Sequence, residues 1–142
     1  MGQYHVVVNL DKKEYLWGGD LGCGVKLWDQ LVNLPSTSTA LIILLACSNG
    51  RGGGDLQDHI DEKVIGRWAG DRIAIVGDYA KPEDLPAEFK ADLIYQKCRH
   101  TNPEYRNIFR LVIPIIEREL GGKYTREGRL LYIHYSQKTD LV

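Results

Sequence analysis

The sequence has few of the features that mark membrane, secreted or nucleic-acid-binding proteins. Its longest apolar run, Ala40 to Cys47, is about eight residues, well short of the roughly 20 that cross a bilayer. Its 18 Lys and Arg residues balance 19 Asp and Glu residues, so a net charge of −1 gives no global field that would attract nucleic acid or an anionic membrane. The N-terminal residues have no basic stretch followed by an apolar one, which would mark an export signal. We therefore expect a cytoplasmic protein with no membrane partner.

Cysteine is scarce, with three residues at Cys23, Cys47 and Cys98. They are far apart and never form a Cys-x-x-Cys pair, so neither a disulfide framework nor a zinc knuckle is indicated. Cys47 ends an apolar run, so we expect it to be a buried small side chain rather than a catalytic thiol. No metal site and no cofactor are predicted.

The chain is 142 residues long, with 44% apolar and 26% charged residues. These values are close to the average for globular proteins and exclude disordered, collagen-like and coiled-coil classes. The length predicts one domain, residues 1–142.

Periodicity and turn residues predict an α+β fold. The expected strands are 4–10 and 14–16 as a hairpin, 25–28, 73–76 with both faces buried, and 129–135; the expected helices are 39–47, 87–98 and 103–120. The first helix is apolar on nearly every face, so we expect the sheet to cover it. Pro114 is expected to kink or end the last one. The strands would form a mixed or antiparallel sheet built from two terminal hairpins and strand 73–76, covered by about three helices.

Residues 7–16 and 132–141 share a pattern of strand, lysine-containing polar turn and apolar end. Two hairpins with the same turn chemistry explain this, and an internal duplication is the alternative. In either case we expect the terminal strands to pair in one sheet.

The chain has MGQY at its start, VNLDKKEYL at 8–16, NGRGGGD at 49–55 and RWAGDRIAIVGDY at 67–79. These motifs resemble a group of small uncharacterised proteins of bacteria and their phages. The resemblance covers roughly the first 80 residues and the last ten. It implies a bacterial or viral source and a cytoplasmic setting, and it carries no activity. Members of the group often have a histidine in the loop where this chain has Trp17-Gly18-Gly19-Asp20, which argues against a metal in that loop.

The glycine-rich loop 49–55 is the most distinctive segment. It lacks the Walker lysine-serine pair and the Rossmann spacing. Free amides in such a loop can form a concavity that binds anions, and an arginine there can pair with a phosphate. The predicted ligand-binding residues are Arg51, Gly52, Gly53, Gly54 and Asp55, together with Trp68 and Tyr79 around the following strand. The alternative is a plain surface loop.

The segment after this loop is acidic. Asp55, Asp58, Asp61 and Glu62 surround His59 and could hold a divalent cation, but their spacing fits neither an EF-hand nor a helical zinc pair. A solvated polar segment is the preferred interpretation.

Catalysis would need acids and bases from other segments. Asp71 and Asp78 lie at opposite ends of strand 73–76, some 20 Å apart, so they cannot form an acid and base pair. His5 and His134 could face each other if the terminal strands pair. Each of these four residues is a weak catalytic candidate.

These observations predict a small binding protein that contacts an anionic ligand, such as a nucleotide or phosphate, or a partner protein. One alternative is a small phosphoesterase or nuclease that uses His and Asp residues. Another is a structural or protein-interaction subunit, which would work as a homo-oligomer.

Overall fold

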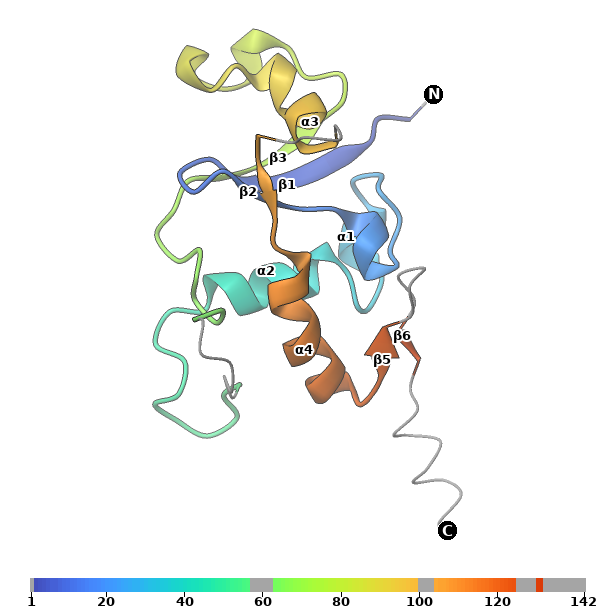
Figure 1. The fold of residues 1–142 in the computed structure, drawn as a ribbon, viewed down its shortest axis with the longest axis vertical. Coiled ribbons are helices and arrows are strands. Elements are labelled where there is room, and N and C mark those ends of the chain that lie inside the picture. The colour runs from blue at the N-terminus through green and yellow to red at the C-terminus, as the bar shows by residue number, and fades with distance from the viewer. Residues whose placement is uncertain (1, 57–62, 100–103, 125–129, 132–142) are drawn as a thin grey trace.

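The computed structural model describes residues 2–56, 63–99, 104–124 and 130–131. Its centre is a mixed four-stranded sheet in the order β3-β1-β2-β4 (Figure 1). The strands are β1 (His5–Asn9), β2 (Glu14–Leu16), β3 (Ile73–Gly77) and β4 (Arg106–Asn107). The predicted α+β class is confirmed.

The predicted N-terminal hairpin is formed by β1 and β2, which pair antiparallel with Val8 opposite Tyr15. Asn9 builds its turn, because its side-chain oxygen accepts the backbone N–H groups of Asp11 at 3.0 Å and Lys12 at 2.8 Å. An asparagine side chain commonly closes a turn in this way. The hairpin is therefore fixed by local sequence.

The predicted strand at 73–76 is also present, as β3, but the expectation that both its faces are buried is wrong. Among the described residues it pairs only with β1, antiparallel and with Val7 opposite Ile75, and it forms one edge of the sheet. Ile75 is consequently 50% exposed. A short run of apolar residues without alternation does not distinguish a central strand from an edge strand.

Helices cover both faces of the sheet. The main helices are α1 (Asp29–Val32), α2 (Thr37–Leu45), α3 (Ala91–Arg99) and α4 (Phe109–Leu120), and short 3₁₀ turns occur at Gly18–Leu21, Pro82–Asp84 and Ala87–Phe89. In Figure 1, α3 lies on one side of the strands and α2 and α4 lie on the other. None of the helices in the described segments is both long and apolar enough to span a membrane.

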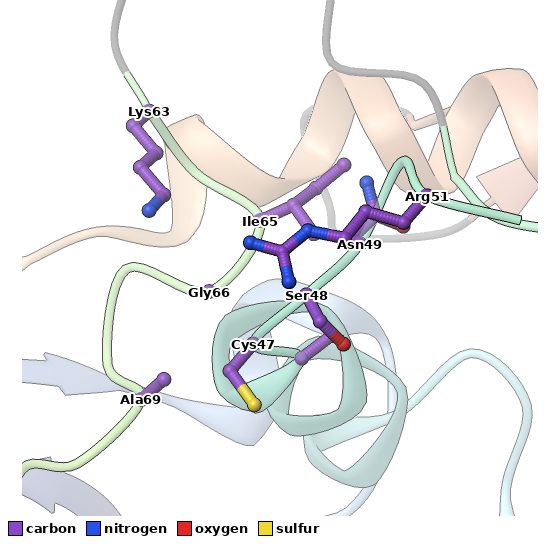
Figure 2. Close-up of a pocket in the computed structure, with 9 residues that line it drawn as sticks. Cys47, Ser48, Asn49, Arg51, Lys63, Ile65, Gly66 and Ala69 are labelled. Atoms are coloured by element: carbon purple, nitrogen blue, oxygen red, sulfur yellow. The ribbon is translucent and has the colours of Figure 1, made fainter.

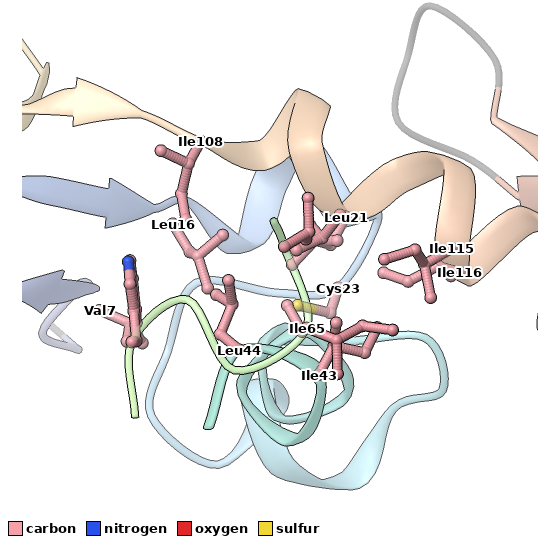
Figure 3. Packing of buried hydrophobic residues seen from close by; sticks show 14 residues of the cluster. Val7, Leu16, Leu21, Cys23, Ile43, Leu44, Ile65, Ile108, Ile115 and Ile116 are labelled. Carbon is pink, nitrogen blue, oxygen red and sulfur yellow. The ribbon is translucent and has the colours of Figure 1, made fainter. Parts of the chain in front are cut away.

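Strand alternation divides the core into two clusters. Val7 and Leu16 face α2 and α4, where they pack with Leu44, Trp68 and Ile115 (Figure 3). The neighbouring β1 residues Val6 and Val8 face the other way, and the second cluster on that side comprises Val6, Val8, Leu10, Tyr15, Val76, Ile94, Cys98 and Tyr105. Successive residues of a strand point to opposite faces, so β1 contributes to both clusters.

Helix α2 begins and ends two residues earlier than the predicted 39–47 and is less covered than expected. Ser36 is its N-cap residue, and the Ser36 backbone N–H donates to Thr39 Oγ1 at 3.1 Å. The sheet and α4 bury Ile43 and Leu44, whereas Ile42 on the opposite side of the helix is 72% exposed. The expectation that the sheet covers an all-apolar helix is wrong for that side.

The strand expected at 25–28 is absent, because this segment bends into α1. The helix expected from residue 103 begins only at Phe109. Before it, the Arg106 N–H donates to the Lys13 carbonyl at 2.8 Å and the Ile108 N–H to that of Tyr15 at 3.2 Å, so pairing with β2 holds this stretch extended. The helix then continues through Pro114 and ends at Gly121, which has a φ of 71°.

The described part of the expected C-terminal strand, β6 (Leu130–Leu131), pairs with β5 (Lys123–Tyr124) in a separate two-stranded sheet. It does not pair with β1, so the prediction that the terminal strands share one sheet is wrong for these residues. The rest of that strand, the second hairpin at 132–141 and His134 lie outside the described residues.

Candidate functional site

A pocket of about 460 Å³ lies beside the glycine-rich loop (Figure 2). The chain that leaves α2, from Ala46 to Arg51, forms one wall, and the segment from Lys63 to Ala69 forms the other. Its volume is within the range of small-molecule sites, roughly 300 to 1,000 Å³. The pocket is therefore large enough for a small molecule and adjoins the predicted loop site.

Glycine at position 66 allows the two walls to approach each other. Gly66 has a φ of 81°, and a Cβ atom there would lie 2.6 Å from the Ala46 carbonyl oxygen. The N–H groups of Gly66 and Trp68 donate to the carbonyls of Ile43 and Leu44, both at 2.9 Å. These bonds satisfy carbonyls at the end of α2 that would otherwise lack partners. The base of the pocket is thus a capped helix end.

The amides of the glycine-rich loop converge on a carboxylate of the same loop. Asp55 Oδ2 accepts the N–H groups of Gly50, Arg51 and Gly52 at 2.6, 3.0 and 3.2 Å. These hydrogen bonds, with Gly50 the largest contributor, lower the pKa of Asp55. The concavity expected to bind an anionic ligand through backbone amides already holds the Asp55 side chain. The nearby Gly53 and Gly54 have open space where a Cβ would stand.

Two cationic side chains remain for a ligand. Arg51 and Lys63 come from opposite walls of the pocket, and Figure 2 shows both side chains extending toward the space between the walls. Neither side chain has an ion-pair or hydrogen-bond partner in the described part of the chain, whereas Lys12, Lys13, Arg67 and Arg72 are all paired with carboxylates. The acidic residues Asp58, Asp61 and Glu62 and their neighbour His59 lie outside the described residues.

Cys47 and Ser48 add a thiol and a hydroxyl to the same pocket. Cys47 is exposed, so the expectation that it is buried is wrong. The reason is that α2 ends at Leu45, before the apolar run does, and the chain then turns outward. Ser48 has a φ of 58°, a conformation that costs free energy in a residue other than glycine and that is often found at binding sites.

Two other predicted ligand residues lie elsewhere. Trp68 is fully buried, and its indole N–H donates to Glu14 Oε1 at 2.8 Å, so it is a core residue. Tyr79 is exposed, two residues beyond the end of β3, and is not among the residues that line the pocket.

The weak catalytic candidates are not brought together. Asp71 forms an ion pair with Lys12 and accepts a hydrogen bond from Asn9 at 2.8 Å, while Asp78 accepts the Tyr4 N–H at 2.9 Å at the other end of β3. His5 lies in β1 opposite Gly77, and its Nδ1 atom is buried without a hydrogen-bond partner among the described residues. In those same residues no three His, Cys, Asp or Glu side chains gather closely enough to hold a metal ion.

The sequence interpretation missed an apolar surface around α1 and α2. Trp28 is 68% exposed, and Leu27, Leu31 and Leu34 are exposed beside it. The available signal was the segment 27–34, which carries five large apolar residues and one charge. That composition is typical of an amphipathic element whose apolar side needs a cover.

Comparisons with protein-family models, with curated proteins and with solved structures give no match for this chain.

Proposed function

We propose that this protein is a small binding protein without catalysis of its own, and that its ligand is a small molecule carrying phosphate. The observation behind the proposal is that Arg51 and Lys63 project from two separate segments into one pocket without an ionic partner in the described residues. Two cations placed together repel each other, and an anion between them would remove that cost.

The chemistry of the lining matches this ligand class. An arginine guanidinium can hold a phosphate by two parallel hydrogen bonds, and a lysine adds a compact positive charge. The Ser48 hydroxyl and the Asn49 backbone supply neutral polar groups in the same pocket. With about 460 Å³ available, the pocket can take a ligand of nucleotide size.

The same lining argues against hydrolysis. Among the described residues that line the pocket there is no His, Asp or Glu side chain, so within this part of the chain Cys47 has no general base beside it. The described lining would hold a bound phosphoester without offering a group to activate water. Binding is therefore favoured over the phosphoesterase alternative.

The test is a thermal-shift measurement with inorganic phosphate, pyrophosphate, AMP and ATP as probes. A ligand at 100 times its Kd stabilises the folded state by about 2.7 kcal/mol. At an unfolding entropy of roughly 2.1 cal/mol/K per residue, this corresponds to a rise in Tm of about 9 °C for a chain of 142 residues. Titration calorimetry with the best probe would then give Kd.

Arg51→Gln and Lys63→Gln should each weaken binding by about 10- to 100-fold, since a hydrogen bond to a charged group contributes about 1.5 to 3 kcal/mol. Arg110→Gln is the matched control, because Arg110 is exposed on α4 and does not line the pocket. The proposal fails if no probe raises Tm, or if Arg110→Gln weakens binding as much as Arg51→Gln does.

A second candidate function is that of a protein-interaction subunit. The exposed apolar side chains around α1 and α2 favour it, because large contiguous apolar patches on a folded protein usually mark binding surfaces.

A further inference from the structure

The apolar surface comprises two adjoining grooves, of about 270 and 510 Å³, which share Leu31 and Ser38. We call it the apolar face and define it by its exposed side chains Leu27, Trp28, Leu31, Leu34, Ile42 and Ile75. Five of these belong to α1, α2 or the chain beside them, and Ile75 belongs to β3. The apolar face therefore ends at the edge of the sheet.

The outer edge of β3 is unpaired within the described residues. The Leu10 N–H donates to the Arg72 carbonyl at 2.8 Å, and the Asp78 N–H donates to that of Tyr4 at 2.9 Å. These two bonds show which residues of β3 point their backbone N–H and C=O groups toward β1. Those of residues 72, 74, 76 and 78 face β1, and those of residues 73, 75 and 77 face outward. Strand edges of this kind are normally protected by lysine, proline or a bulge, and Ile73–Gly77 has neither a charge nor a proline.

We propose that a second copy of this chain covers this edge, with two β3 strands pairing antiparallel across a two-fold axis at Ile75. In this register the N–H of Ile75 in each copy donates to the carbonyl of Ile75 in the other copy. Ile73 then lies opposite Gly77 of that copy. The two four-stranded sheets would become one continuous sheet of eight strands, and the interface would be symmetric, as in most homodimers.

Charge complementarity selects this register. With Ile75 at the axis, Arg72 of each copy, whose guanidinium also pairs with Asp11 of its own chain, lies opposite Asp78 of the other, and both side chains are exposed. An axis at Ile73 would instead place the Asp71 carboxylate opposite Ile75, and an axis at Gly77 would place Asp78 opposite Val76. Opposite charges facing each other across antiparallel strands stabilise the pairing.

The side-chain faces agree with the same arrangement. Ile75 is directly opposite Val7 in the β1–β3 pair, so it lies on the face that packs against α2. Pairing at Ile75 would bring the β3 ends of the two apolar faces together, with Trp28 and Leu31 beside the axis. Arg72 lies on the opposite face, where its guanidinium stacks over Phe89 at 4.8 Å. Apolar groups would thus meet on one face and charged groups on the other.

The mass of the purified chain in solution tests the proposal, measured by light scattering or sedimentation from about 1 to 200 µM. We expect a concentration-dependent rise toward twice the monomer mass of 16.1 kDa. Ile75→Lys places two like charges at the axis and should weaken the dimer by at least about 100-fold. Ile75→Pro removes an outward-facing N–H and should act in the same direction. Leu93→Lys is the matched control, because Leu93 is an exposed apolar residue on α3 that lies outside the apolar face.

A cysteine at the axis tests the register. In a Cys47→Ser background, which removes the exposed thiol, Ile75→Cys should form a disulfide between copies under mild oxidation. Paired residues at this type of position have Cα atoms about 5.5 Å apart, within the range of a disulfide. Tyr79→Cys, which is exposed but far from the axis, should not cross-link. Far-UV circular dichroism confirms that each variant is folded.

A monomeric mass at every concentration overturns the proposal. A dimer that Ile75→Lys leaves intact, or that Ile75→Cys does not cross-link, also overturns it, because the copies would then meet through another surface. Binding of an unrelated chain to the β3 edge of a monomer would contradict self-association directly. None of these outcomes depends on the phosphate pocket, so the two proposals stand or fall separately.

Discussion

Removing the Glu14 carboxylate should destabilise the fold more than removing any exposed acid. Glu14 is 4% exposed in β2 and is the acceptor at the centre of a buried network. Its Oε2 atom lies 2.6 Å from Arg67 Nη2, and its Oε1 atom accepts the Trp68 indole N–H at 2.8 Å. These bonds connect the N-terminal hairpin to the segment that forms the second wall of the pocket.

Glu14→Ala leaves the buried Trp68 N–H without this acceptor and removes the carboxylate that balances Arg67. Breaking a buried ion pair from one side typically costs about 3 to 5 kcal/mol. With an unfolding entropy of roughly 0.3 kcal/mol/K for a chain of this length, Tm should fall by about 10 to 17 °C. Glu14→Gln keeps a side-chain oxygen that can accept the Trp68 N–H, so it should lower Tm less than Glu14→Ala does.

The same network predicts an acid-dependent difference between variants. Burial alone would raise the pKa of Glu14, but hydrogen bonds from Arg67 and Trp68 outweigh it and hold the pKa below its ordinary value of 4.5. A carboxyl whose pKa is lower in the folded state stabilises the fold fully above its unfolded pKa and loses that contribution as pH falls through the folded one. Below pH 4.5, the stability gap between the wild type and Glu14→Gln should therefore shrink.

Differential scanning calorimetry from pH 7 to pH 3 measures both effects. Glu104→Ala is the control, because Glu104 is exposed and its pairs with Lys13 and Lys97 lie at the surface. Exposed pairs contribute little, so Tm should change far less than for Glu14→Ala. A loss below about 1 kcal/mol for Glu14→Ala, or a gap that widens in acid, would refute the argument.

Two further predictions concern the loop and the thiols. Asp55→Ala frees the amides of Gly50, Arg51 and Gly52 and removes a negative charge beside Arg51. Phosphate should therefore bind more tightly to this variant than to the wild type, as measured by titration calorimetry. Weaker binding would mean that the ligand needs the loop held closed by Asp55. Iodoacetamide should alkylate one thiol quickly in the native protein, because Cys47 is exposed, Cys23 is buried, and burial raises the pKa of Cys98 to about 12. Intact-mass analysis would show two fast additions if this assignment is wrong.

The glycine-rich loop shows how far the sequence could predict the site. Four glycines in seven residues predicted a loop at 49–55, and the chain is irregular there. The sequence could not show that the Asp55 side chain binds the loop amides, because an aspartate at that position could equally well point into solvent. Nor could it show that Lys63 faces Arg51, since their approach depends on Gly66 packing against the end of α2.

Local sequence determined the elements whose hydrogen bonds lie close together in the chain. The hairpin follows from Asn9 and its turn, the start of α2 from Ser36, and the end of α4 from Gly121. In each case the partners of the hydrogen bonds lie within a few residues of each other, so the local sequence is enough to predict the turn, the cap or the helix end.

Tertiary structure decided what depends on partners far apart in the sequence. It placed β3 at the edge of the sheet, held residues 106–108 extended against β2 instead of in a helix, and left Ile42 and Trp28 exposed. A residue's apolar character states that burial is favourable, but only the arrangement of the other elements determines whether burial happens. The local chemistry of this chain therefore fixed its turns and caps, while the packing of distant segments decided its pocket, its open edge and its uncovered apolar face.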